Sequence, residues 1–230
     1  DKNTDILMVI PGASRDTQRF HASWLSFAKE DTFAVVTIGA SKKYFPDEYS
    51  YNAGNVIDPQ GNLNKKKVWL FSAVEKIFKK VKAKYNLETK NFHLFGHSAG
   101  GGFVHRYMLL MPSAPVVKAV AANPAFVTLP NKKETYPFGL KGLPIKKTMV
   151  NEWLGKDLAI FLGEDDIGPR TKPLSNGPRA RKQGPSCLSR GKKLYREAKE
   201  EAIKRNTRFG WSLSIVSGVG HNNKLIAPHA

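Results

Sequence analysis

Six short apolar runs rich in β-branched and aromatic residues recur along the chain, and segments with helical periodicity separate them. The predicted strands are residues 5–10, 34–38, 92–95, 117–121, 157–162 and 211–217. The predicted helices are residues 16–29, 65–85, 98–111 and 191–205. This alternation is typical of a parallel sheet covered by helices on both faces. We therefore expect an α/β fold, a three-layer sandwich around a mostly parallel sheet of about six strands.

Length and composition favour a globular protein with a full apolar core. The chain has 230 residues, of which 41% are hydrophobic and 24% are charged. A chain of this size buries roughly 70% of its unfolded surface, so we expect residues 1–230 to form a single domain. The single cysteine, Cys187, excludes an internal disulfide, and no Cys/His cluster predicts a zinc site. No apolar run approaches the ~20 residues of a membrane span.

The charge balance is strongly basic, with 37 Lys and Arg against 19 Asp and Glu and a formal net charge of +18. Residues 170–208 alone contain 13 Lys and Arg and three Glu. Such an excess attracts anionic surfaces and anionic substrates. Nucleic acid would favour the same charge, but no nucleic-acid-binding motif accompanies it, so we do not expect that partner. The chain begins at Asp1 without an initiator Met, either because a leader has been removed or because the sequence was cut there. The first explanation favours a secreted or periplasmic protein, and the compartment stays open.

The third predicted strand runs directly into Gly96, His97, Ser98, Ala99 and Gly100, and a helical segment follows. This is the G-x-S-x-G pattern in the strand–turn–helix context that a nucleophile elbow requires. Small residues let the chain close sharply around the serine, and the new helix places its positive end beneath a developing oxyanion. The pattern predicts that Ser98 is a nucleophile; the alternative is a plain tight turn.

A nucleophilic serine needs a base, and His221 has the best position among the six histidines. It follows the last predicted strand through Gly218, Val219 and Gly220, at the sheet edge where reactive groups collect. We expect the others to be structural or to line a pocket: His21, His93, His97, His105 and His229.

The base needs a carboxylate to hold its tautomer. Glu164, Asp165 and Asp166 follow the penultimate strand, and the chain order Ser, Asp, His is that of α/β-hydrolases. Spacing alone leaves Asp165 and Asp166 open, whereas we expect Glu164 to be a solvated turn carboxylate.

An oxyanion hole needs two amides. The loop after the first strand predicts Ala13 as one donor, and the residue after the nucleophile predicts Ala99 as the other. The alternative for the first loop is a simple turn capped by Ser14 or Asp16.

Together these segments resemble an α/β-hydrolase of the poly(3-hydroxybutyrate) depolymerase-like and cutinase-like esterase branch. The resemblance covers most of the chain and includes residues 9–13, 51–55, 94–101, 103–106, 121–124, 136–140, 162–169 and 218–222. It implies the α/β-hydrolase fold, and it favours Asp166 over Asp165 as the acid. The chain departs from the pattern in its short segment before the first strand and in stopping soon after His221, so we expect either a minimal fold or a trimmed chain.

The expected function is hydrolysis of carboxylic esters, of small molecules or of a polyester, through an acyl-enzyme intermediate. This chemistry needs no metal or organic cofactor. Peptidase or acyltransferase chemistry on the same triad is the main alternative, because the triad does not specify the leaving group or the acceptor. A further alternative is a non-catalytic module that binds polyanions through its basic face.

Two smaller expectations concern the surroundings of the site. Tyr44, Phe45, Tyr49, Tyr51 and Phe126 follow the second and fourth strands and could line the mouth of the pocket, although ordinary loop packing is equally compatible. We expect no catalytic role for Cys187, whose basic neighbours would lower its thiol pKa.

Overall fold

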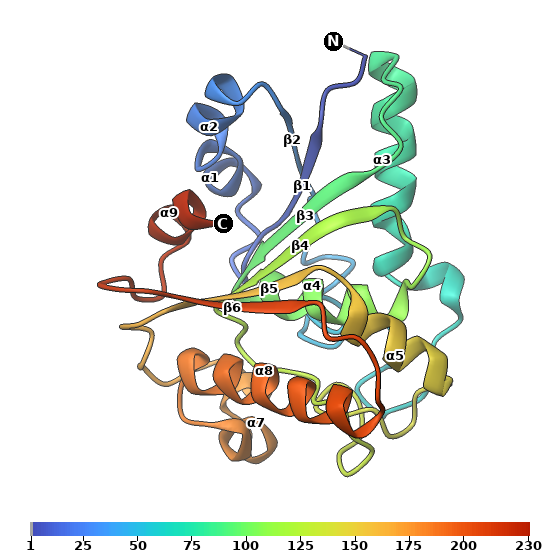
Figure 1. Ribbon diagram of the computed structural model, residues 1–230, viewed down its shortest axis with the longest axis vertical. Helices are drawn as coiled ribbons and strands as arrows, with labels where there is room; N and C mark the ends of the chain where they lie inside the picture. The colour runs from blue at the N-terminus through green and yellow to red at the C-terminus, as the bar shows by residue number, and fades with distance from the viewer. Residues whose placement is uncertain (1) are drawn as a thin grey trace.

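The computed structural model describes residues 2–230 and has a six-stranded parallel sheet at its centre (Figure 1). The strand order is β2-β1-β3-β4-β5-β6, with every neighbouring pair parallel. The strands are β1 (Ile6–Ile10), β2 (Ala34–Thr37), β3 (Phe92–His97), β4 (Val116–Ala122), β5 (Leu158–Gly163) and β6 (Trp211–Val216). All six predicted strands are confirmed.

Helices cover both faces of the sheet and make the expected three layers (Figure 1). The larger core contains side chains of α3 (Phe71–Tyr85), α4 (Ala99–Leu110), α5 (Lys147–Gly155) and α8 (Cys187–Lys204). The smaller core, on the other face, contains side chains of α1 (Thr17–Ala22), α2 (Leu25–Glu30) and α9 (Asn223–Ile226). The remaining elements are α6 (Pro173–Asn176), α7 (Pro178–Gln183), η1 (Lys66–Val68) and η2 (Ala227–His229).

The first predicted helix is wrong as a continuous element, because α1 and α2 are separated at Ser23 and Trp24. The Ser23 hydroxyl donates to the Arg19 carbonyl at 3.0 Å and accepts from the Asn223 amide at 3.0 Å. Side-chain bonds of this kind compete with the helical ladder. Trp24 turns onto the sheet instead, where its ring lies 4.8 Å from that of Phe95. The break therefore lets Trp24 enter the smaller core.

Two other helix boundaries differ from the predictions, and three further helices were not predicted. Helix α3 begins at Phe71, because Trp69 is extended and donates its indole N–H to the Asn64 carbonyl at 2.9 Å. Helix α8 begins at Cys187, four residues early, where Ser186 and Ser189 form a capping box. Helix α5 and the short α6 and α7 lie in stretches for which no helix was predicted. Tertiary packing stabilises these elements, since Trp153 of α5 is fully buried.

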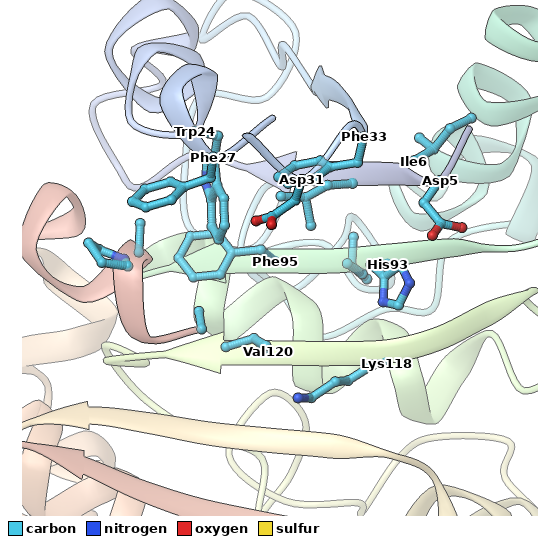
Figure 2. Close-up of a pocket in the computed structure, with 15 residues that line it drawn as sticks. Asp5, Ile6, Trp24, Phe27, Asp31, Phe33, His93, Phe95, Lys118 and Val120 are labelled. Atoms are coloured by element: carbon cyan, nitrogen blue, oxygen red, sulfur yellow. The ribbon is translucent and has the colours of Figure 1, made fainter. Parts of the chain in front are cut away.

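A pocket of about 370 Å³, lined by both apolar and charged side chains, lies on the smaller-core face, at the end of the sheet where β1 begins (Figure 2). Trp24 and Phe27 lie above Phe95 of β3, and Lys118 and Val120 of β4 form the opposite side. His93 of β3 points into this pocket, in agreement with the expectation that it is structural or lines a pocket.

The turn between β3 and α4 closes through backbone approaches that only glycine permits. A Cβ atom on Gly96 would lie 2.3 Å from the Gly100 carbonyl oxygen, and one on Gly100 would lie 2.1 Å from the Ile10 carbonyl oxygen. Both distances are far below van der Waals contact. The start of α4 therefore packs directly against the end of β1, which brings the loop after β1 next to Ser98.

We expect Gly100→Ala to destabilise the protein by about 1–3 kcal/mol or more, because the new methyl group would push α4 away from the β1 backbone. Urea unfolding followed by circular dichroism measures this change. Gly39→Ala is the matched control: its Cβ would make an ordinary 3.6 Å contact with Thr17, so its stability should change by no more than about 0.5 kcal/mol. Equal midpoints for the two variants would contradict the packing argument.

Candidate active site

Ser98 lies at the carboxyl end of β3 in a strained backbone conformation. Its φ is 59° and its ψ is −114°, values that non-glycine residues rarely adopt. Such strain persists only where the surrounding structure enforces it, and it concentrates at functional sites. The turn places the Ser98 side chain at the N-terminus of the twelve-residue helix α4, where the helix dipole is positive.

The structure brings three of the sequence-predicted side chains into one hydrogen-bonded chain. His221 Nε2 lies 2.8 Å from Ser98 Oγ, and His221 Nδ1 lies 2.6 Å from Asp166 Oδ2. The three residues follow β3, β5 and β6, so they meet at the carboxyl edge of the sheet. With Nδ1–H donated to the carboxylate, Nε2 is free to accept the serine proton.

The geometry separates the two neighbouring aspartates that the spacing left open. Asp166 is buried, with 2% of its surface exposed, and bonds to His221, whereas Asp165 is exposed. Glu164 is also exposed and accepts a hydrogen bond from the Ser217 hydroxyl at 2.6 Å. Glu164 is thus an exposed turn residue, as expected, and its carboxylate is hydrogen-bonded to Ser217.

Asp166 has a cationic neighbour that the sequence analysis did not identify. Nη2 of Arg170 lies 3.4 Å from Asp166 Oδ1, the oxygen that does not bond to His221. The same nitrogen donates to the Gly168 carbonyl at 3.2 Å. The four-residue spacing between Asp166 and Arg170 was the available signal, but it predicts an ion pair only where the chain turns as tightly as it does here.

The expectation for the Cys187 thiol pKa is wrong. Cys187 is fully buried. Burial raises its thiol pKa, and the charge of nearby Asp166 raises it further. Asp166, Cys187 and His221 have donor atoms within 4.8 Å of one another, so they are the natural group in residues 2–230 to test as metal ligands. The fit is poor, because His221 already bonds to Asp166 and a metal would need the thiolate that burial disfavours.

The two amides predicted for an oxyanion hole lie beside the serine. Ala13, Ser98 and Ala99 line the same cavity, and within residues 2–230 neither the Ala13 nor the Ala99 N–H has a hydrogen-bond acceptor. Tyr51 fixes the loop that contains Ala13, because its hydroxyl donates to the Pro11 carbonyl at 2.6 Å. The guanidinium of Arg15 stacks 3.5 Å from the centre of the Tyr51 ring.

Two buried histidines lie outside the hydrogen-bonded chain. The His97 ring lies 4.7 Å from that of His221, and burial holds its pKa well below the ordinary value. His105 accepts from the Thr128 N–H at 3.0 Å, and burial also lowers its pKa. Both rings are therefore neutral and structural, in agreement with the sequence analysis.

Two cavities meet at Ser98, and both contain cationic groups. One, of about 310 Å³, is lined by Ala13, Glu48, Asn52, Ser98, Ala99, Ala125, Pro169, Arg170, Thr171, Lys172 and Ser175. The other, of about 350 Å³, is lined by Gly12, Ala13, Ser14, Arg19, Phe20, Ser23, His97, Ser98, His221, Asn222, Asn223 and Lys224. Burial raises the pKa of Glu48, which lines the first cavity. Its carboxylate accepts the Leu174 N–H at 2.7 Å and so connects two segments that form the walls of this cavity.

The aromatic mouth considered from the sequence is absent from these two cavities. Tyr51 and Phe126 are buried in the core, Phe45 and Tyr49 pack against it, and Tyr44 is exposed. None of the five lines either cavity at Ser98. Ordinary packing is thus their role, and the lining of both cavities includes charged side chains instead.

Comparison with known proteins places the chain in a family. No protein-family model and no curated protein matches the chain. Among solved structures, poly(aspartic acid) hydrolase-1 from Sphingomonas sp. KT-1 superposes with a TM-score of 0.95 and 34% identity, over 100% of this chain and 87% of that one. LpqC, a poly(3-hydroxybutyrate) depolymerase from Bordetella parapertussis, gives 0.93 and 29%, over 99% and 77%.

More distant structures share the fold alone. The esterase Pf2001 from Pyrococcus furiosus has a TM-score of 0.53 and 12% identity, over 100% of this chain and 79% of that one. No helix within residues 2–230 is long and apolar enough to cross a membrane. On the parallel sheet and the similarity to the first two enzymes, the chain belongs to the α/β-hydrolase superfamily, in the branch of poly(3-hydroxybutyrate) depolymerase-like hydrolases.

Proposed function

We propose that this hydrolase cleaves carboxylic esters through a Ser98–His221–Asp166 triad, with residues 1–230 acting as one catalytic domain. The observation that carries the proposal is the unbroken hydrogen-bonded chain from Ser98 Oγ through both His221 nitrogens to Asp166 Oδ2. In such a chain the imidazole removes the hydroxyl proton while the carboxylate stabilises the imidazolium that forms.

The reaction proceeds in two acyl-transfer steps. His221 Nε2 takes the Ser98 proton as Oγ attacks the ester carbonyl, and the negative charge moves to the carbonyl oxygen. The Ala13 and Ala99 amides, which have no acceptor in residues 2–230, would bind that oxygen, and one such donor contributes about 3 kcal/mol. His221 then protonates the leaving alcohol, and water releases the acyl group by the same route.

Ser98→Ala and His221→Ala should each lower kcat on 4-nitrophenyl esters by about 10⁴-fold or more, because each removes a group that acts as part of the triad. The measurement is initial rate across a series from acetate to long acyl chains. Circular dichroism and the melting temperature establish that each variant is folded. Full turnover by either folded variant would contradict the proposal.

Asp166→Asn should lower kcat by about 10⁴-fold, since the amide cannot hold the His221 tautomer. Asp165→Asn, at the exposed neighbouring carboxylate, is the matched control and should remain within about threefold of the wild type. Steady-state kinetics on 4-nitrophenyl butyrate compare the two. The reverse order of effects would make Asp165 the acid.

A second candidate function is hydrolysis of amide bonds in an acidic polymer. One observation favours it: Arg170 and Lys172 line one cavity at Ser98, and Arg19 and Lys224 line the other. The similarity to a poly(aspartic acid) hydrolase and the net charge of +18 agree with it. Degradation of poly(aspartic acid), compared with that of poly(3-hydroxybutyrate), would decide between the two polymers.

If the cationic walls select anionic acyl groups, kcat/KM for 4-nitrophenyl hemisuccinate should exceed that for 4-nitrophenyl butyrate and fall several-fold as salt rises, because ions screen the attraction. Lys172→Gln with Lys224→Gln should reduce the preference. The control pair, Lys79→Gln with Lys80→Gln on the exposed side of α3, should leave it unchanged. Equal salt dependence for both esters would remove the support for an acidic substrate.

A further inference from the structure

Asn123 lies directly after β4, between the strand that leads to Ser98 and the strand that leads to Asp166. It is fully buried, and its φ of 42° is in the left-handed region. Asparagine tolerates this region better than most other residues do. The triad chemistry described above does not use it.

The Asn123 side chain bonds to three separate chain segments. Its Oδ1 accepts the Gly163 N–H at 2.7 Å, which fixes the orientation of the amide. Its Nδ2 therefore faces the other two partners and lies 3.4 Å from His97 Nε2 and 3.4 Å from the Gly220 carbonyl oxygen. Burial keeps His97 neutral by lowering its pKa, and in the Nδ1–H tautomer Nε2 has a lone pair that accepts this bond.

These three partners lie in the chain segments that contain the three residues of the proposed triad. His97 precedes Ser98, Gly220 precedes His221, and Gly163 lies three residues before Asp166. The backbone of the same strand end adds two ties: Ser98 N–H donates to the Ala122 carbonyl at 2.9 Å, and Asn123 N–H donates to the Phe161 carbonyl at 2.8 Å. One buried amide thus connects every segment that carries a reacting group.

We propose that Asn123 is a positioning residue that holds the Ser98, His221 and Asp166 segments in mutual register; this inference rests on the proposed function. The amide is suited to the task because it accepts on one side and donates on the other, which neither aspartate nor an apolar residue can do. The two 3.4 Å bonds are individually weak. Their importance is geometric, since an error of about 1 Å in a catalytic group can cost about 10²-fold in rate.

The test removes the amide without straining the backbone. Asn123→Gly suits the positive φ and deletes all three side-chain bonds, so we expect kcat on 4-nitrophenyl butyrate to fall at least tenfold, with KM within twofold. Inactivation by a phosphonate ester, which reports the nucleophilicity of Ser98, should slow in parallel. Asn123→Asp keeps the Gly163 bond but loses both donors, and its kcat should also fall on the plateau of the pH profile.

Two controls separate positioning from stability. Asn86→Gly removes an asparagine of similar φ, 52°, from the end of α3. Gln183→Ala deletes another buried amide, which donates to the Val127 carbonyl at 2.7 Å and lines neither cavity at Ser98. Both should keep kcat within twofold, even where Gln183→Ala lowers the melting temperature as much as Asn123→Gly.

The outcomes distinguish the two proposals. If wild-type turnover does not depend on Ser98, the proposed function fails and the positioning role fails with it. If turnover depends on Ser98 but Asn123→Gly keeps a normal kcat and inactivation rate, only the positioning role is overturned. If Asn123→Gly does not fold, Asn123→Asp decides: a plateau kcat equal to that of the wild type overturns the role, and a tenfold loss in folded protein supports it.

Discussion

The approach of helix α4 to the end of β1 is the contact on which the rest of the site depends. Gly100 lets the helix start against the Ile10 carbonyl, and Gly96 lets the chain reverse beneath it. This proximity puts Gly12 where its Cβ would lie 3.6 Å from that of Ser98. A side chain at Gly100 would separate the proposed nucleophile from the loop that contains the Ala13 amide, so this backbone contact shapes both the elbow and the proposed oxyanion site.

Buried polar side chains fix the irregular loops near this contact through hydrogen bonds. Arg106 of α4 is fully buried and donates to the carbonyls of Asn52, Gly102, Phe126 and Pro137 and to the Thr128 hydroxyl. Burial lowers its pKa to about 10, so it stays charged at neutral pH. Buried polar groups of this kind are stable only when every donor has a partner. The hydrogen bonds of Arg106 and Asn123 thus fix irregular segments relative to the sheet.

The charge distribution connects the composition to the site. The excess of basic residues over the whole chain continues into both cavities at Ser98, through Arg170 and Lys172 on one side and Arg19 and Lys224 on the other. These cationic groups would attract a carboxylate on the substrate. This is the physical basis for testing an anionic substrate alongside a neutral polyester.

Local sequence patterns were sufficient to predict the parallel sheet, the elbow at Ser98 and His221 at the last strand, because apolar periodicity and glycine spacing act over a few residues. The choice of Asp166 over Asp165 needed either the resemblance or the structure, since adjacent aspartates differ only in which one the turn buries. Tertiary structure alone decided the break at Trp24, the burial of Tyr51 and Cys187, and the contact between Arg170 and Asp166. It also gave Asn123 its three partners. Each of these depends on segments far apart in the chain, and a bond between such segments exists only after the sheet has brought their ends together.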